Sequence, residues 1–211
     1  MRQQRHSRYS IVAIALHWLI AAAIILMVPL GWWMADNVSD PSQASRVFKA
    51  YQLHKSIGLT ILVLSVLRVV WRFTHRFPPL PGHMPPWEKA AARASHFLLY
   101  AIILLMPLTG WIYVSAGWNA AMNAPFAVPT IWFGLFEWPH ISFIAEAADA
   151  TRAEVATTAI TIHAWMAWGA VVLVAIHVLA AIKHHIIDRD DVLTSMLPWP
   201  SRRRAELQGE N

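Results

Sequence analysis

Histidines within apolar stretches are the residues whose type and spacing indicate chemistry in this sequence. His163 and His177 lie 14 residues apart in one apolar run. This spacing places them on one face of a helix and about 21 Å apart along it. His54 lies in a second run near the depth of His163, and His17 lies in a third near the depth of His177. An ionisable side chain at membrane depth is costly, so these histidines are candidates for a functional site.

Two histidine pairs at two depths favour two b-type haems. Porphyrin is flat and apolar, and its iron takes one axial ligand on each side. A structural, hydrogen-bonded role is the common one for a lone histidine in a helix. Binding of zinc or copper is another role for a histidine pair, although zinc sites usually use three or four ligands with few apolar flanks. A proton relay would mix histidine with Asp or Glu, and the apolar runs contain neither.

The composition indicates a membrane protein and excludes several kinds of site. Of 211 residues, 57% are hydrophobic and 14% are charged, whereas soluble domains contain about 25% charged residues. The chain has no cysteine, so disulfides, thiolate iron–sulfur clusters, cysteine zinc sites and thioether-attached haem are excluded. Neither common glycine-rich nucleotide-binding motif is present.

Four apolar stretches are long enough to cross a bilayer as helices. They cover about residues 11–34, 51–71, 94–115 and 157–182, joined by an external loop at 116–156. The predicted fold is an all-α membrane protein, a four-helix transmembrane bundle forming a single domain over residues 1–211. The first run is longer than the apolar region of a signal peptide and is expected to be retained.

The basic residues predict the orientation of the helices, with both termini cytoplasmic. Those assigned to the cytoplasmic side are Arg2, Arg5, Arg8, Arg72, Arg76, Lys89, Arg93, Lys183, Arg189, Arg202, Arg203 and Arg204. Those assigned to the outer side are Arg46, Lys49, Lys55 and Arg152. The net charge of +5 is therefore a topology signal with anionic-lipid contacts, and no nucleic-acid partner is expected.

The external loop and an internal repeat are two further features. The loop carries three tryptophans, which indicate either an interfacial aromatic belt or a lid over an outer site. A short amphipathic helix is expected within residues 142–153. The first and third spans each have an early histidine, His17 or His96, and a late Pro–Gly–Trp cluster. A parallel duplication of two hairpins explains this match, and shared apolar composition is the alternative.

Several segments together resemble the bacterial cytochrome b561 family of inner-membrane dihaem cytochromes, from about residue 8 to residue 198. They are RYSIVAIALHWLIA, HKSIGLTILVLSVLRVVWR, SHFLLYAIILLMPLTGW, WFGL in the loop, and HAWMAWGAVVLVAIHVLAAIKHHIIDRDDVLTSMLP. The resemblance implies that His17 and His177 hold a cytoplasmic-side haem. It implies that His54 and His163 hold an outer haem.

Two further residues are expected at the cytoplasmic-side haem. His96 matches a family histidine that is not a ligand; it would touch a propionate or replace His17. Arg68 lies at the same depth and is expected to pair with a propionate, with snorkelling to the interface as the alternative.

The resemblance also implies a reaction. The family is similar to enzymes that exchange electrons with membrane quinone, and we expect superoxide to be oxidised outside and ubiquinone to be reduced. Outer cations would steer the superoxide anion. His184 lies seven residues past His177 on nearly the same face, where it would hydrogen-bond a quinone or be an ordinary interfacial histidine. The alternative function is an electron-transfer subunit for a dehydrogenase, hydrogenase or periplasmic redox partner; a haem-free structural or transport protein is the third.

Overall fold

The computed structural model describes residues 8–82 and 84–198 of the chain. Four long helices form its frame: α1 (Ile11–Asn37), α2 (Ala44–Thr74), α3 (Pro86–Ala116) and α5 (Asp149–Ile186). Each is long and apolar enough to cross a membrane, so the four expected spans are confirmed. The basic residues expected at positions 2, 5 and 202–204 lie outside the described part of the chain.

Local sequence signals account for the helix ends. Ser10 caps α1, and its hydroxyl accepts a hydrogen bond from the backbone of Ala13 at 3.2 Å. Pro86 begins α3 at a position where a missing N–H costs nothing. Gly117 ends α3 with φ +56°, a conformation that glycine adopts without steric cost. The helices continue beyond the apolar runs, so α5 begins eight residues before the span expected at 157.

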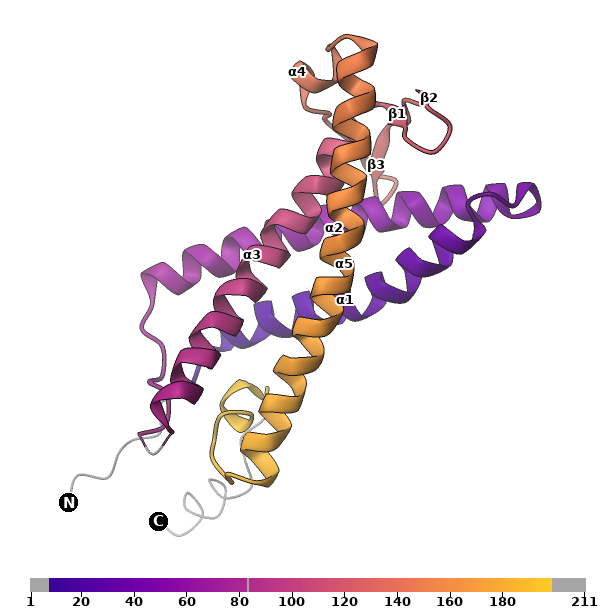
Figure 1. The fold of residues 1–211 in the computed structure, drawn as a ribbon. Coiled ribbons are helices and arrows are strands. Elements are labelled where there is room, and N and C mark those ends of the chain that lie inside the picture. Colours follow the sequence, from indigo (N-terminus) through magenta and orange to yellow (C-terminus); the bar gives the residue numbers. More distant parts are fainter. Residues whose placement is uncertain (1–7, 83, 199–211) are drawn as a thin grey trace, which may run out of the picture.

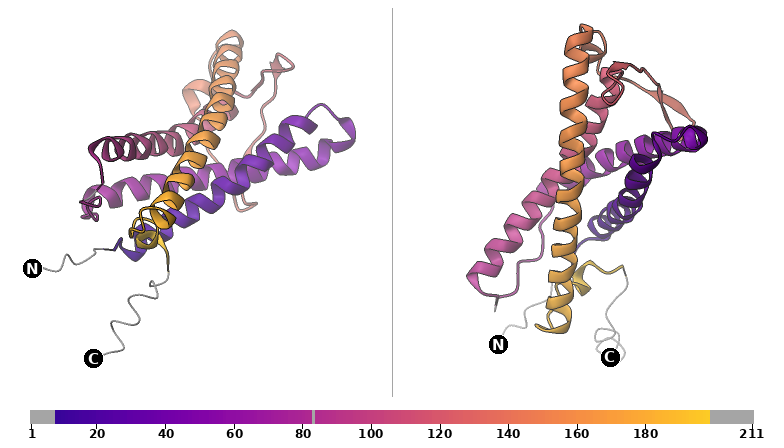
Figure 2. Two further views of the ribbon diagram at one scale, coloured as in Figure 1. Left: turned by 60° about the horizontal axis from the view of Figure 1, so that its bottom comes forward. Right: turned by 45° about the vertical axis from the view of Figure 1, so that its right-hand side comes forward.

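The helices pair as two hairpins. α1 packs along α2, α3 packs along α5, and α2 joins the hairpins by packing against α3. Figures 1 and 2 show α5 crossing the α1–α2 hairpin obliquely. We call the end with the start of α1 and the end of α5 the terminal end. The other end, which holds the connection between α3 and α5, is the loop end.

The loop end contains structure that the sequence analysis did not predict. It has two antiparallel sheets of two strands each, β1 (Trp118–Asn119) with β2 (Ala124–Pro125) and β3 (Thr130–Trp132) with β4 (Phe136–Trp138). The short helix expected within residues 142–153 is α4 (Ser142–Ala145), and α5 already begins at Asp149. A small apolar core of Ala116, Ile144 and Ala156 fixes α4 between α3 and α5.

Two short 3₁₀ helices complete the described chain. η1 (Pro41–Gln43) joins α1 to α2, and η2 (Thr194–Met196) lies beyond α5. η2 returns to the start of α1, where the indole of Trp18 donates to the carbonyl of Met196 at 2.7 Å. This contact fixes the segment after α5 against the terminal end of the bundle.

Candidate functional site

At the loop end, His54 of α2 faces His163 of α5. Their ring centres are 6.1 Å apart, and the ring planes are inclined by 61°. A metal–imidazole bond of about 2 Å, with each ring centre about 1 Å behind its nitrogen, places two opposed imidazole centres about 6 Å apart. The two rings are therefore at the separation that a single metal ion between them requires.

The surroundings of His163 indicate which of its ring nitrogens is available as a ligand. Nδ1 of His163 lies 3.0 Å from the Met106 carbonyl oxygen and 3.0 Å from the Thr109 hydroxyl oxygen. An Nδ1–H donating to these oxygens leaves Nε2 as the ligand atom, an arrangement typical of metal-binding histidines. Nδ1 of His54 is buried and has no hydrogen-bond partner among the described residues. A buried imidazole nitrogen without a partner fits a coordination site.

Two glycines, Gly31 of α1 and Gly110 of α3, leave room for this pair. A Cβ atom at Gly110 would lie 3.4 Å from Cε1 of His163. A Cβ atom at Gly31 would lie 3.7 Å from Cε1 of His54. Each glycine thus lies against the imidazole of a neighbouring helix, where a larger side chain would move the ring.

At the terminal end, His177 of α5 faces two histidines. His17 of α1 lies 6.2 Å from it between ring centres, and His96 of α3 lies 5.6 Å from it. The separation of His17 and His177 is nearly that of the loop-end pair. His96 is exposed, whereas the four paired histidines are half-buried, and its Nδ1 lies 2.7 Å from the Ala92 carbonyl oxygen of its own helix. The structure brings all three rings together.

Both pairs lie where α5 meets the other hairpin, and α3 borders each of them, through Met106, Thr109 and Gly110 at the loop end and through His96 at the terminal end. The hairpin partner of α5 is α3, and the pairs join α5 to α2 and to α1. The histidine rings thus meet between two hairpins that cross rather than lie in parallel (Figure 2). Histidine is the strong haem ligand available in a chain without cysteine. The paired histidines of this region therefore suit haem, a flat and apolar cofactor.

Arg68 lines a small cavity next to the terminal-end histidines. The cavity holds about 30 Å³ and is lined by Tyr9, Ala13, Arg68, Trp71, Arg72, Phe77, His96, Tyr100 and Met196. The Arg68 guanidinium donates to the Ala13 carbonyl at 2.9 Å, which holds it within the bundle. Arg72 adds a second positive charge, and burial raises the pKa of the Tyr9 phenol. The lining is therefore suited to an anionic group such as a carboxylate.

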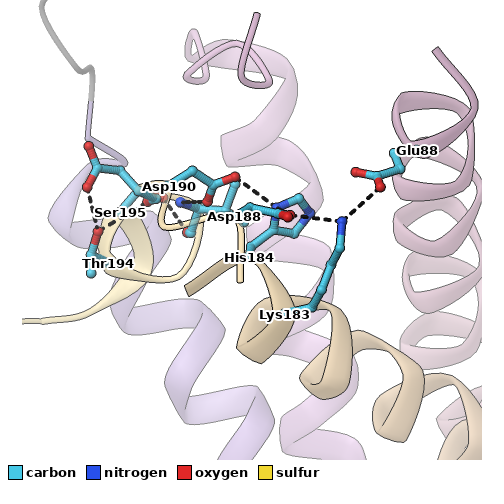
Figure 3. Close-up of polar contacts among 9 residues, drawn as sticks. Glu88, Lys183, His184, Asp188, Asp190, Thr194 and Ser195 are labelled. Atoms are coloured by element: carbon cyan, nitrogen blue, oxygen red, sulfur yellow. Dashed lines mark hydrogen bonds and ion pairs between the residues drawn. The ribbon is translucent and has the colours of Figure 1, made fainter. Parts of the chain in front are cut away.

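His184 lies in a charged cluster at the terminal end (Figure 3). Its Nδ1 is 2.8 Å from a carboxylate oxygen of Asp190 and 3.0 Å from one of Asp188. Lys183 pairs with Glu88 of α3 at 2.8 Å and with Asp188 at 2.9 Å. Glu88, His184 and Asp188 have ligand atoms close enough for a metal ion, but the Lys183 ammonium already contacts both carboxylates.

Hydrogen bonds attach the loop to α2 beside His54. The Pro129 carbonyl accepts from the side chains of Gln52 at 2.9 Å and Lys55 at 3.0 Å. The backbone of Phe133 donates to the hydroxyl of Ser56 at 3.0 Å. The WFGL segment is the turn between β3 and β4, with positive φ at Phe133 and Gly134.

Arg152 is a structural residue at the loop end. Its guanidinium donates to the carbonyls of Ala116 at 2.7 Å and Gly117 at 2.9 Å. It also pairs with Asp149 at 3.2 Å, and its side chain is only 17% exposed. These bonds connect the last carbonyls of α3 to the first turn of α5. The expected role of Arg152 as a steering cation has less support than this structural one.

Some site residues were not found from the sequence. Met106 and Thr109 contribute oxygens to His163, and a backbone carbonyl leaves no sequence signal. Asp188 and Asp190 follow His184 closely in the chain, so the acidic run after the two histidines was the available signal.

The chain matches a known protein family along most of its length. The family model described as prokaryotic cytochrome b561 matches residues 8–199. "Cytochrome b561 homolog 2" of Escherichia coli K12 is 37% identical over 193 residues, which cover 90% of this chain and 91% of the relative. "Probable superoxide oxidase CybB" of Yersinia pestis is 25% identical over 198 residues, covering 92% and 97% of the two chains.

Proposed function

The chain belongs to the prokaryotic cytochrome b561 family, and we propose that it moves electrons across the membrane from superoxide to ubiquinone. Membership makes it a multi-pass inner-membrane protein that binds b-type haem and transfers electrons. The observation that carries the finer proposal is the pair of histidine sites at two depths, with ring centres 6.1 and 6.2 Å apart.

Two haems are assigned to these sites. His54 and His163 would hold the loop-end haem. His17 and His177 would hold the terminal-end haem, with His96 beside it and Arg68 next to a propionate. Haem bound through two histidines would supply a one-electron carrier without an open coordination position for oxygen.

The membrane orientation follows from the positive charges, with the terminal end cytoplasmic and the loop end outside. Arg46 and Lys49 lie exposed on the outer turn of α2, where they would attract an anion such as superoxide. The lid attached to α2 would then cover the outer histidine pair. In this arrangement superoxide is oxidised at the loop end.

At the terminal end the proposed substrate is ubiquinone, near His184. His184 is about 10 Å beyond His177 along α5 and on nearly the same face. Two superoxide anions give two molecules of oxygen and two electrons, and one ubiquinone takes these electrons with two protons to become ubiquinol. One of the relatives is named a probable superoxide oxidase, which supports superoxide as the electron donor.

Rapid mixing of the purified haem-loaded protein with superoxide tests the proposal. We expect haem reduction faster than spontaneous superoxide decay, followed by reoxidation when ubiquinone is added. Reduction by ubiquinol without reduction by superoxide would contradict the proposal. That result would instead support an electron-transfer subunit for a dehydrogenase, a hydrogenase or a periplasmic partner.

A further inference from the structure

The segment after α5 returns to place a carboxylate against His184. α5 ends at Ile186, and the backbone of Asp190 donates to the His184 carbonyl at 3.1 Å. Arg189 between them has φ +53°, an unfavourable conformation for a side chain of its type. The strained turn brings Asp190 back to the last turn of α5 (Figure 3).

Asp190 is itself held in place. Its Oδ1 accepts from the backbone of Val192 at 3.0 Å, while its Oδ2 lies 2.8 Å from Nδ1 of His184. The Asp190 side chain is 6% exposed and that of His184 is 13% exposed. The contact is therefore a buried, oriented one rather than a surface ion pair.

The contact decides which nitrogen of His184 can exchange a proton. A carboxylate only accepts hydrogen bonds, so Nδ1 must carry a hydrogen. Asp188 Oδ2 lies 3.0 Å from the same nitrogen but also pairs with the Lys183 ammonium at 2.9 Å, so the shorter contact, that of Asp190, is the one that fixes the tautomer. Nε2 is then the nitrogen that gains and loses a proton, as in sites where an acid or base is oriented by a third group.

We propose that Asp190 is a positioning residue that holds His184 with Nε2 ready to protonate reduced quinone. This inference rests on the proposed function, because it assigns the proton step of the same quinone site. As the quinone oxygen gains electron density, the Nε2–H bond breaks and an O–H bond forms. Water at the terminal end then returns a proton to Nε2, and the Asp190 carboxylate keeps Nδ1–H throughout.

The test compares Asp190→Asn with Asp191→Asn in the haem-loaded protein. Asp191 is a matched control, since it lies one residue further on and bonds Thr194 instead of His184. An amide at position 190 can donate to Nδ1, which favours the wrong tautomer. We expect Asp190→Asn to slow haem reduction by a short-chain ubiquinol at least about tenfold. Asp191→Asn should stay within about twofold of the wild type.

Two further readouts separate positioning from general damage. Ubiquinone binding, followed by tryptophan fluorescence, should weaken less than about threefold in Asp190→Asn, because the effect concerns proton transfer rather than binding. Haem reduction by superoxide without quinone should be unchanged. Wild-type protein that superoxide cannot reduce would refute the proposed function. A ubiquinol rate in Asp190→Asn within twofold of wild type, or an equal loss in Asp191→Asn, would overturn the role of Asp190.

Discussion

Replacing Arg152 tests whether this residue steers superoxide or holds the loop end together. The side chain donates to the carbonyls of Ala116 and Gly117, the last groups of α3. A hydrogen bond from a charged donor contributes about 1.5–3 kcal/mol, so Arg152→Ala removes about 3–6 kcal/mol of stabilisation. Arg152→Lys keeps the charge but not the planar fork that reaches both carbonyls, so it should lose about half as much.

Thermal unfolding of the haem-loaded protein in detergent measures this loss. For a chain of this size, about 3 kcal/mol corresponds to a fall in the unfolding midpoint of roughly 6–12 °C. Arg46→Ala is the matched control, because it removes an exposed outer-side charge whose guanidinium lies 3.5 Å from the Gln43 amide oxygen. That variant should unfold within about 2 °C of the wild type.

The rate of reduction by superoxide at low and high salt completes the test. Steering depends on charge and weakens as salt screens it. If Arg152 steers superoxide, Arg152→Lys will keep the wild-type rate, and Arg152→Ala will lose the salt dependence without unfolding earlier. That pattern would refute the structural role derived from the two carbonyl contacts.

Two further predictions concern the space and the charge around the histidine pairs. Gly110→Val should remove the loop-end haem, because its methyl groups extend from a Cβ that already lies 3.4 Å from the His163 ring. Gly169→Val is the control and should keep both haems, because its Cβ meets only the flexible end of Ile102 at 3.9 Å. Equal haem content in the two variants would contradict this packing argument. Arg68→Gln should lower the midpoint potential of the terminal-end haem by tens of millivolts, because a nearby positive charge favours the reduced form. An unchanged potential in a spectroelectrochemical titration would mean that Arg68 only snorkels.

The four spans followed from the sequence because the bilayer imposes a simple rule. A run of about 20 apolar residues has few alternatives to a transmembrane helix. The pairing of histidines followed from the regular rise of the helix, which converts the spacing of His163 and His177 into two depths. The structure then added what spacing alone lacks, namely that each ring faces a partner on another hairpin.

The loop end and the polar contacts could not be predicted in the same way. The strands there are two or three residues long, and hydrogen bonds to α2 hold them rather than a strong periodic pattern. The role of Arg152 depends on two backbone carbonyls. A backbone carbonyl is chemically the same at every position, so the sequence does not indicate which ones an arginine will contact. The strained Arg189 turn also depends on contacts made after folding, so the closeness of Asp190 and His184 was not visible in the sequence.

Haem content per chain tests the central claim most directly. The wild-type protein should contain two b-type haems, counted as the pyridine haemochrome against protein concentration. His54→Ala and His177→Ala should each contain one, because each removes a ligand from a different pair. His96→Ala should keep two, since His17 completes the terminal-end site. Two haems in either ligand variant, or one in the wild type, would contradict the assignment of two bis-histidine sites.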